Sequence, residues 1–119
     1  MKKYRVPKTI RDVARRAIEQ NLERPISQRA AYKEEGDKKV QGTGMRTARR
    51  LLSGSVDERQ LLLMRAWFAR HGAAEESKKA RKDRTSKASI AYRLWGGSSA
   101  ISWINSTLRE IERAKKKSK

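Results

Sequence analysis

Apolar residues recur along most of this 119-residue chain at spacings of three and four, the period of an amphipathic helix. The spacing predicts a first helix over residues 8–23, ended by Pro25. It predicts a second over residues 43–52, with Gly54 at the position that often closes a helix. No stretch shows the strict alternation of a half-buried strand. The pattern therefore predicts an all-α fold.

A third helix is expected directly after the second. Ser55 and Glu58 have the spacing of a capping box, which predicts Ser55 as the N-cap of a helix that reaches about Arg70. Its apolar positions form the widest stripe in the chain, so we expect this helix to be the most buried element. The residues of that stripe are Leu61, Leu62, Leu63, Met64, Trp67 and Phe68.

Two adjacent glycines separate the last two of about five predicted helices. One helix is expected over about residues 87–95, and the other follows with Ser98 or Ser99 as its N-cap. Glycine reaches positive φ without strain, so Gly96 and Gly97 allow the chain to reverse in little space.

This reversal predicts an aromatic cluster. Trp95 lies just before the glycines and Trp103 shortly after them, so we expect their rings to meet, with Trp67 completing the cluster. Because large aromatic side chains dominate the energetics of a small core, we favour this structural role over stacking of Trp103 on an unpaired base. The predicted core residues of this region are Trp67, Phe68, Trp95, Gly96, Gly97 and Trp103.

Three segments carry no continuous apolar face. Residues 25–42 contain Pro, Gly and a charge run, which predict a linker or long loop with room for one short helical turn. Residues 73–88 predict a basic loop or a solvated helical extension, and residues 115–119 a mobile, lysine-rich end. The expected organisation is an N-terminal helix (1–24), the linker, a helical core (43–114) that includes the basic loop, and the tail.

The net charge indicates the kind of partner that the protein binds, which the helical pattern does not. The chain has 31 Lys and Arg against 13 Asp and Glu, a formal net charge of +18 that is spread over the predicted helices as well as the tail. A free domain of this charge repels itself, which favours a polyanionic partner. Nucleic acid is the first expectation, because neutralising phosphates releases condensed counterions. An acidic protein could neutralise the positive charge as well, whereas a membrane surface is less favoured because the apolar stripes are needed for the core.

Basic side chains gather in three groups, on the exposed side of the second helix, in residues 73–88 and in the tail. Spacings of three and four in the first group form a stripe that can follow a phosphate backbone. No element presents the mixture of Asn, Gln and Arg typical of a base-reading helix, so we expect binding to DNA or RNA with little sequence preference. The predicted contacts are Arg46, Arg49, Arg50, Lys78, Lys79, Arg81, Lys82, Arg84 and Lys87.

Residues that support catalysis or metal binding are scarce. The chain has no cysteine and one histidine, and its carboxylates are scattered among basic residues, so neither a zinc nor a magnesium site is predicted. No serine lies in a nucleophile elbow, and His71 is expected to bond a carbonyl or to pack on Trp67. We therefore expect a protein without enzymatic activity or cofactor. The absence of cysteine, of an apolar signal segment and of a membrane-length run favours a soluble protein of a reducing compartment.

Positions 44–105 contain a series of short motifs. It consists of a G-x-x-x-A-R segment, a helix ending in F-x-R-H, a charged gap, and L-W-G-G followed by a tryptophan. In these residues the chain resembles a short helical domain of bacteriophage-associated proteins, although its charged gap holds more Lys and Arg than that pattern. The resemblance implies a phage or prophage origin, a place in the host cytoplasm or the virion, and no catalytic activity. The matching residues are Gly44, Ala48, Arg49, Phe68, Arg70, His71, Leu94, Trp95, Gly96, Gly97, Trp103 and Asn105.

Two functions remain open on the sequence. The first is binding of nucleic acid through its phosphates. The second is docking on an acidic protein, as a virion component or as a host-directed inhibitor of a nucleic-acid enzyme. A helix-turn-helix interpretation of residues 47–72 is less favoured, because the pair of short helices that precedes such a unit is missing.

Overall fold

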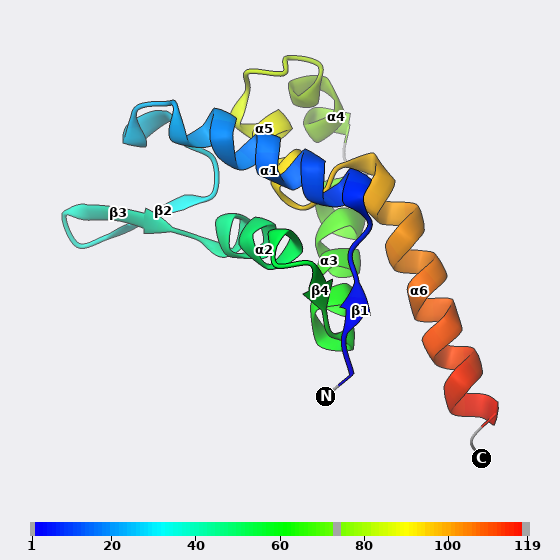
Figure 1. The fold of residues 1–119 in the computed structure, drawn as a ribbon. Helices are drawn as coiled ribbons and strands as arrows, with labels where there is room; N and C mark the ends of the chain where they lie inside the picture. The colour runs from blue at the N-terminus through cyan, green and yellow to red at the C-terminus, as the bar shows by residue number, and fades with distance from the viewer. Residues whose placement is uncertain (1, 73–74, 118–119) are drawn as a thin grey trace.

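The computed structural model describes residues 2–72 and 75–117 and is mostly helical, with a few short strands (Figure 1). The helical character is as predicted, and the strands correct the expectation of an all-α chain. In chain order the elements are β1 (Tyr4–Arg5), α1 (Lys8–Leu22), the 3-10 turn η1 (Ile26–Gln28), β2 (Tyr32–Glu35), β3 (Lys38–Gln41), α2 (Thr43–Leu52), β4 (Ser55–Val56), α3 (Glu58–His71), α4 (Glu75–Arg81), α5 (Lys87–Leu94) and α6 (Ser98–Lys117).

Helix α1 organises the centre of the fold. It packs against both α2 and α5, while α3 packs along α6 (Figure 1). The apolar residues on the buried face of α1 belong to the stripe predicted from its spacing, but Leu22, which the prediction also placed there, is 40% exposed. Helix α2 has the predicted bounds. The apolar residues that α1 buries are Ile10, Ala14, Ala17 and Ile18.

The start of α3 differs from the prediction. Ser55 is part of β4, which pairs antiparallel with β1 so that Ser55 lies opposite Arg5. The N-cap is Asp57, whose carboxylate accepts the backbone N–H of Gln60 at 2.8 Å. The predicted capping box is therefore wrong, because strand pairing keeps the Ser55 backbone extended and moves the cap two residues on.

Residues 25–42 form a β-hairpin and a 3-10 turn rather than a linker. Strands β2 and β3 pair around Gly36, which has a φ of +65°. Opposite charges face each other across the strands, with Glu35 opposite Lys38. The segment is tied to α1 by the buried Asn21 side chain, which donates to the Ala30 carbonyl at 2.9 Å and accepts its N–H at 2.8 Å.

Helix α3 has more apolar residues than its buried face can hold. Leu61, Met64 and Phe68 are buried as predicted. Leu62 and Leu63, which the spacing predicts on the inward stripe, are 40% and 48% exposed. These two leucines leave an apolar strip on the outer side of α3.

The double glycine turns the chain between α5 and α6 as predicted. Gly96 and Gly97 have φ values of +106° and +71°. A Cβ on Gly96 would lie 2.7 Å from the Cβ of Ala100 and 3.1 Å from Cγ2 of Ile10. Glycine is therefore required at this corner for both its backbone conformation and its small volume.

Helix α6 continues further than the sequence predicted. It reaches Lys117, so residues 115–117 are helical and not a mobile tail, and residues 118–119 lie outside the described part. Nζ of Lys115 pairs with Oε2 of Glu58 at 2.9 Å. This ion pair ties the last turns of α6 to the first turn of α3.

The aromatic cluster forms with a different member. The rings of Trp67 and Trp95 stack with centroids 4.8 Å apart and planes 10° apart. Trp103 packs against the core but makes no ring contact with other aromatic residues among those described, so the predicted meeting with Trp95 is wrong. The reason is the direction of Trp95, whose Nε1 lies beside Gly44 on α2. Phe68, Trp95, Gly96 and Gly97 are buried as predicted, and Trp67 is partly buried.

Candidate nucleic-acid interface

The three arginines of α2 are exposed, as predicted, and their side chains are held by neutral oxygens. Arg46 donates through Nη1 to the Gln41 carbonyl at 3.1 Å, and Arg49 donates through Nε to Oε1 of Gln41 at 3.1 Å. Arg50 donates through Nη1 to Oε1 of Gln60 at 2.5 Å. Within residues 2–72 and 75–117 none of these arginines pairs with a carboxylate. They are oriented while their charge stays unneutralised.

The partners of these arginines come from rigid elements. Gln41 ends β3, so the hairpin sets the directions of Arg46 and Arg49. Gln60 is only 4% exposed, and its Nε2 lies 3.5 Å from Oγ1 of the buried Thr47. The sequence did not identify Gln41 or Gln60, because their roles depend on the hairpin and on the approach of α3 to α2.

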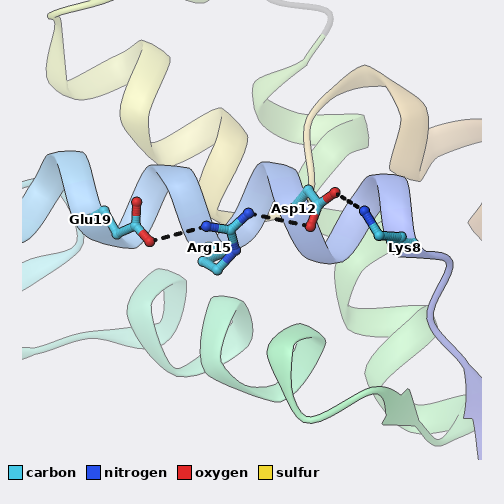
Figure 2. Close-up of polar contacts among 4 residues, drawn as sticks. All are labelled: Lys8, Asp12, Arg15 and Glu19. Carbon is cyan, nitrogen blue, oxygen red and sulfur yellow. Dashed lines mark hydrogen bonds and ion pairs between the residues drawn. The ribbon is translucent and has the colours of Figure 1, made fainter.

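Helix α1 treats its charges differently (Figure 2). Lys8 pairs with Asp12 at 3.1 Å, and Arg15 bridges Asp12 at 3.5 Å and Glu19 at 3.3 Å. Hydrogen bonding from Lys8 lowers the pKa of the Asp12 carboxyl below its ordinary value of 3.8, and the charges of Lys8 and Arg15 act in the same direction. This row of four side chains neutralises itself.

A hollow of about 530 Å³ opens beside the α2 arginines, and we call it the basic hollow. Its cations come from α2, from α3 and from the segment before β1. Among the described residues that line it, the carboxylate is that of Asp57, which is already engaged as the N-cap of α3. The lining residues are Lys3, Thr43, Arg46, Arg50, Ser53, Ser55, Val56, Asp57, Arg59, Gln60 and Leu63.

Lys3 and Arg59 are members of this hollow that the sequence did not single out. Arg59 lies in the first turn of α3, and Lys3 precedes β1. The pairing of β1 with β4 brings Lys3 to the same place as Arg59. No local sequence pattern predicts that Lys3 and Arg59 line the same hollow, because the two residues are far apart in the chain.

The other predicted basic group, residues 78–87, is helical over its first part. Helix α4 buries no residue, which agrees with a solvated helical extension rather than a loop. Arg81 donates to the carbonyls of His71 and Gly72, at 3.3 Å and 3.1 Å, and its guanidinium lies 4.2 Å from the Tyr92 ring centroid. Arg81 therefore closes the C-terminal end of α3 and has a structural role besides its charge.

Other residues of this segment bond to one another, and Lys87 bonds to η1. Lys78 pairs with Glu75 at 3.5 Å, and Lys87 donates to the Ser27 carbonyl at 3.3 Å. The Thr85 hydroxyl and N–H bond the Asp83 carboxylate and lower the pKa of that group below 3.8. The exposed cations of the segment include Lys79, Lys82 and Arg84.

The two predicted basic groups do not form one site. The basic hollow is lined by α2, and no residue of 75–87 contributes to it. We therefore treat the hollow and the α2 arginines as the candidate site, and residues 75–87 as a separate basic surface.

His71 and the acidic residues are the groups relevant to catalysis or metal binding. The ring of His71 lies 4.9 Å from that of Trp67, as predicted for a packing role. Among the residues that the structure describes, no group of three or more His, Asp or Glu side chains lies close enough to hold a metal ion. In the same residues, no helix combines the length and apolar character needed to cross a bilayer.

Together these features define a small, mostly helical, strongly basic domain with an arginine-lined hollow. Comparison of the chain with protein-family models, with curated proteins and with solved structures gave no match. The resemblance to a bacteriophage-associated helical domain thus stays a prediction from the residues that carry it.

Proposed function

We propose that this protein is a small, non-enzymatic, phage-type protein that binds nucleic acid mainly through the phosphate backbone. The observation that carries the proposal is the chemistry of the α2 arginines, which are held in place by neutral oxygens and lack carboxylate partners within the described residues. An arginine that is oriented in advance loses less side-chain freedom when it binds, and one without a counter-charge keeps its full attraction for an anion.

The basic hollow supports the same conclusion. Lys3, Arg46, Arg50 and Arg59 surround it, and guanidinium groups match the geometry of phosphate oxygens. A concave surface lined by one sign of charge concentrates the field and speeds the approach of a polyanion. The separate basic surface of residues 75–87 extends the attraction to a second part of the strand.

The test is fluorescence anisotropy of labelled single-stranded and double-stranded DNA and RNA, titrated with the protein over a series of salt concentrations. We expect binding at micromolar concentration or tighter, with log affinity falling linearly as log salt rises. The slope reports the number of phosphates contacted, at about 0.9 per contact on duplex DNA. Affinity independent of salt, or no binding even at low salt, would contradict the proposal.

A second candidate function is docking on an acidic protein, either a virion component or a host enzyme that acts on nucleic acid. The observation in its favour is the exposed apolar side chain of Leu63, which lines the basic hollow beside the arginines and which a phosphate backbone offers little to cover. A stoichiometric complex from host lysate that survives nuclease treatment, together with absent nucleic-acid binding, would favour this candidate over the first.

A further inference from the structure

A second hollow adjoins the basic one. It measures about 560 Å³, lies between α2, α3 and α5, and we call it the aromatic hollow. Four residues line both hollows, so the two lie next to each other between α2 and α3, and we call the pair the groove. The shared residues are Thr43, Arg50, Gln60 and Leu63.

The groove changes character along its length. Its basic end carries Lys3, Arg46 and Arg59. Its other end is walled by Trp67 and His71, with Arg70 also on the lining. Leu63 lies in both parts, so the apolar strip of α3 partly belongs to this groove.

A polar group at the aromatic end has no protein partner. Trp95 is 5% exposed, and its indole N–H makes no hydrogen bond within the described part of the chain. The Nε1 atom lies beside Gly44, where an added Cβ would stand 3.3 Å from it. Gly44 therefore leaves the N–H uncovered by a side chain at that position. The Nε1 atom itself is not fully buried, so an acceptor of a ligand in the groove can reach it.

From these features we propose that the groove receives one unpaired nucleotide of the bound strand. Its phosphate lies among Arg46, Arg50 and Arg59, and its base lies against Trp67 with an acceptor atom turned to the Trp95 N–H. This inference rests on the proposed function and adds a preference for single strands. A base inside a duplex cannot enter, because it is stacked on both faces and its phosphates lie outside the stack.

The site for the base is thus Trp67 and Trp95, and not Trp103, the residue the sequence offered as a stacking platform. Trp95 and His71 already pack against the Trp67 ring, so the base contacts the part of this partly buried ring that they leave uncovered. An indole beside a cationic groove is the combination that single-strand-binding proteins use. The charge of the groove excludes a neutral aromatic ligand as the preferred occupant, since the cations of its basic end would then stay unmatched.

The test uses a variant that fills the aromatic hollow without touching the core. Ala66 lines that hollow and is exposed, so Ala66→Phe places a ring in the groove from the solvent side of α3. The matched control is Ala69→Phe, one helical turn on, exposed on α3 but outside both parts of the groove. The probes are a labelled oligothymidylate of about ten nucleotides, within the usual site size, and a duplex of equal length.

We expect Ala66→Phe to weaken binding of the oligothymidylate about tenfold and binding of the duplex less than about twofold, an effect of the size of one lost base stack. The control is expected to change neither affinity. In the unmodified protein, the oligothymidylate should also shift the indole Hε1 resonance of Trp95 in an NMR titration, and the duplex should leave it in place.

Three results would overturn the inference. Equal affinity for both probes without a Trp95 shift would refute it and leave phosphate binding intact. A Trp95 shift produced by an acidic, phenylalanine-containing peptide but not by oligothymidylate would assign the groove to a protein partner. Absence of binding by either nucleic acid at low salt would refute the proposed function and this inference with it.

Discussion

Helices α1 and α2 both carry a row of charged side chains at helical spacing, and the two rows differ in what each cation bonds. On α1, Lys8 and Arg15 pair with Asp12 and Glu19 in a ladder of ion pairs (Figure 2). On α2, the arginines donate to amide, carbonyl and hydroxyl oxygens. Counting basic residues along each helix does not reveal this difference.

The difference separates two uses of positive charge. Exposed ion pairs such as those of α1 contribute little free energy, and they leave no net charge for a ligand. Arginines bonded to neutral groups gain orientation and keep their charge. The hairpin and α3 supply these neutral groups through Gln41 and Gln60, so the tertiary fold leaves the α2 arginines oriented and without a counter-charge among the described residues.

The largest expected effect comes from removing the charges of α2. The triple variant Arg46→Gln, Arg49→Gln and Arg50→Gln should weaken duplex DNA binding about 100-fold or more at low salt. It should also reduce the salt slope by about 2.7, since each contact contributes about 0.9. The measurement is anisotropy over a salt series. The matched control removes three charges from the exposed end of α6, Arg113→Gln, Lys116→Gln and Lys117→Gln. An equal loss in both variants would show that total charge, and not α2, governs binding.

A smaller effect is expected when one α2 arginine receives a carboxylate partner, like the cations of α1. Gln41→Glu keeps the shape of the acceptor that Arg49 uses but turns it into a carboxylate. The new ion pair should weaken nucleic-acid binding by up to about tenfold, which corresponds to the loss of roughly one phosphate contact. Gln28→Glu is the control, because it changes the net charge equally at an exposed position in η1. If both variants lose the same affinity, the change in net charge explains the loss and the ion pair with Arg49 does not.

The converse change should have a weaker effect of opposite sign. Asp12→Asn together with Glu19→Gln removes the acids from the ladder and releases Lys8 and Arg15. We expect affinity for duplex DNA to rise about threefold, because two more cations become available on α1. The rise is small because these cations would not be held in one orientation, as the α2 arginines are by Gln41 and Gln60. The same anisotropy assay measures it, with circular dichroism to verify that the helix is retained. A rise as large as the loss in the α2 variant would refute the importance of orientation.

The smallest expected effect is a titration shift on α1. Because Lys8 donates to Asp12, the folded-state pKa of Asp12 lies below its ordinary value of 3.8. The stabilisation from this pairing is therefore complete above pH 3.8 and is lost as the pH falls through the folded-state pKa. NMR titration of the Asp12 carboxyl should give a midpoint below 3.8, and Lys8→Gln should raise it. A midpoint at or above 3.8 would show that the ladder is absent in solution.

Much of the helical part of the fold was predictable because local spacing determines it. The bounds of α2 and the turn at Gly96 and Gly97 follow from periodicity and from the backbone freedom of glycine. The hairpin was not predicted, since its strands show no alternation of apolar and polar residues. Their register depends on cross-strand charge pairs and on the bonds between Asn21 and Ala30, which join different elements.

The candidate site was predictable in part for a related reason. The α2 arginines form a visible stripe, and their exposure is confirmed. Lys3 and Arg59 join them only through strand pairing, and the groove depends on Trp95 approaching Gly44 from a distant helix. Leu63 was misplaced because a wide apolar stripe does not reveal which of its positions a neighbouring helix covers.

The pairing of β1 with β4 joins residues that are synthesised at different times. Tyr4 leaves the ribosome long before Val56, its partner, and Trp95 appears later still. Contacts between such separated residues form late, because the intervening chain must first be closed into a loop. A nascent chain that ends before Trp95 would carry the arginines of α2 but no complete groove. The proposed preference for single strands would therefore require the chain to be complete through α5 and Trp95.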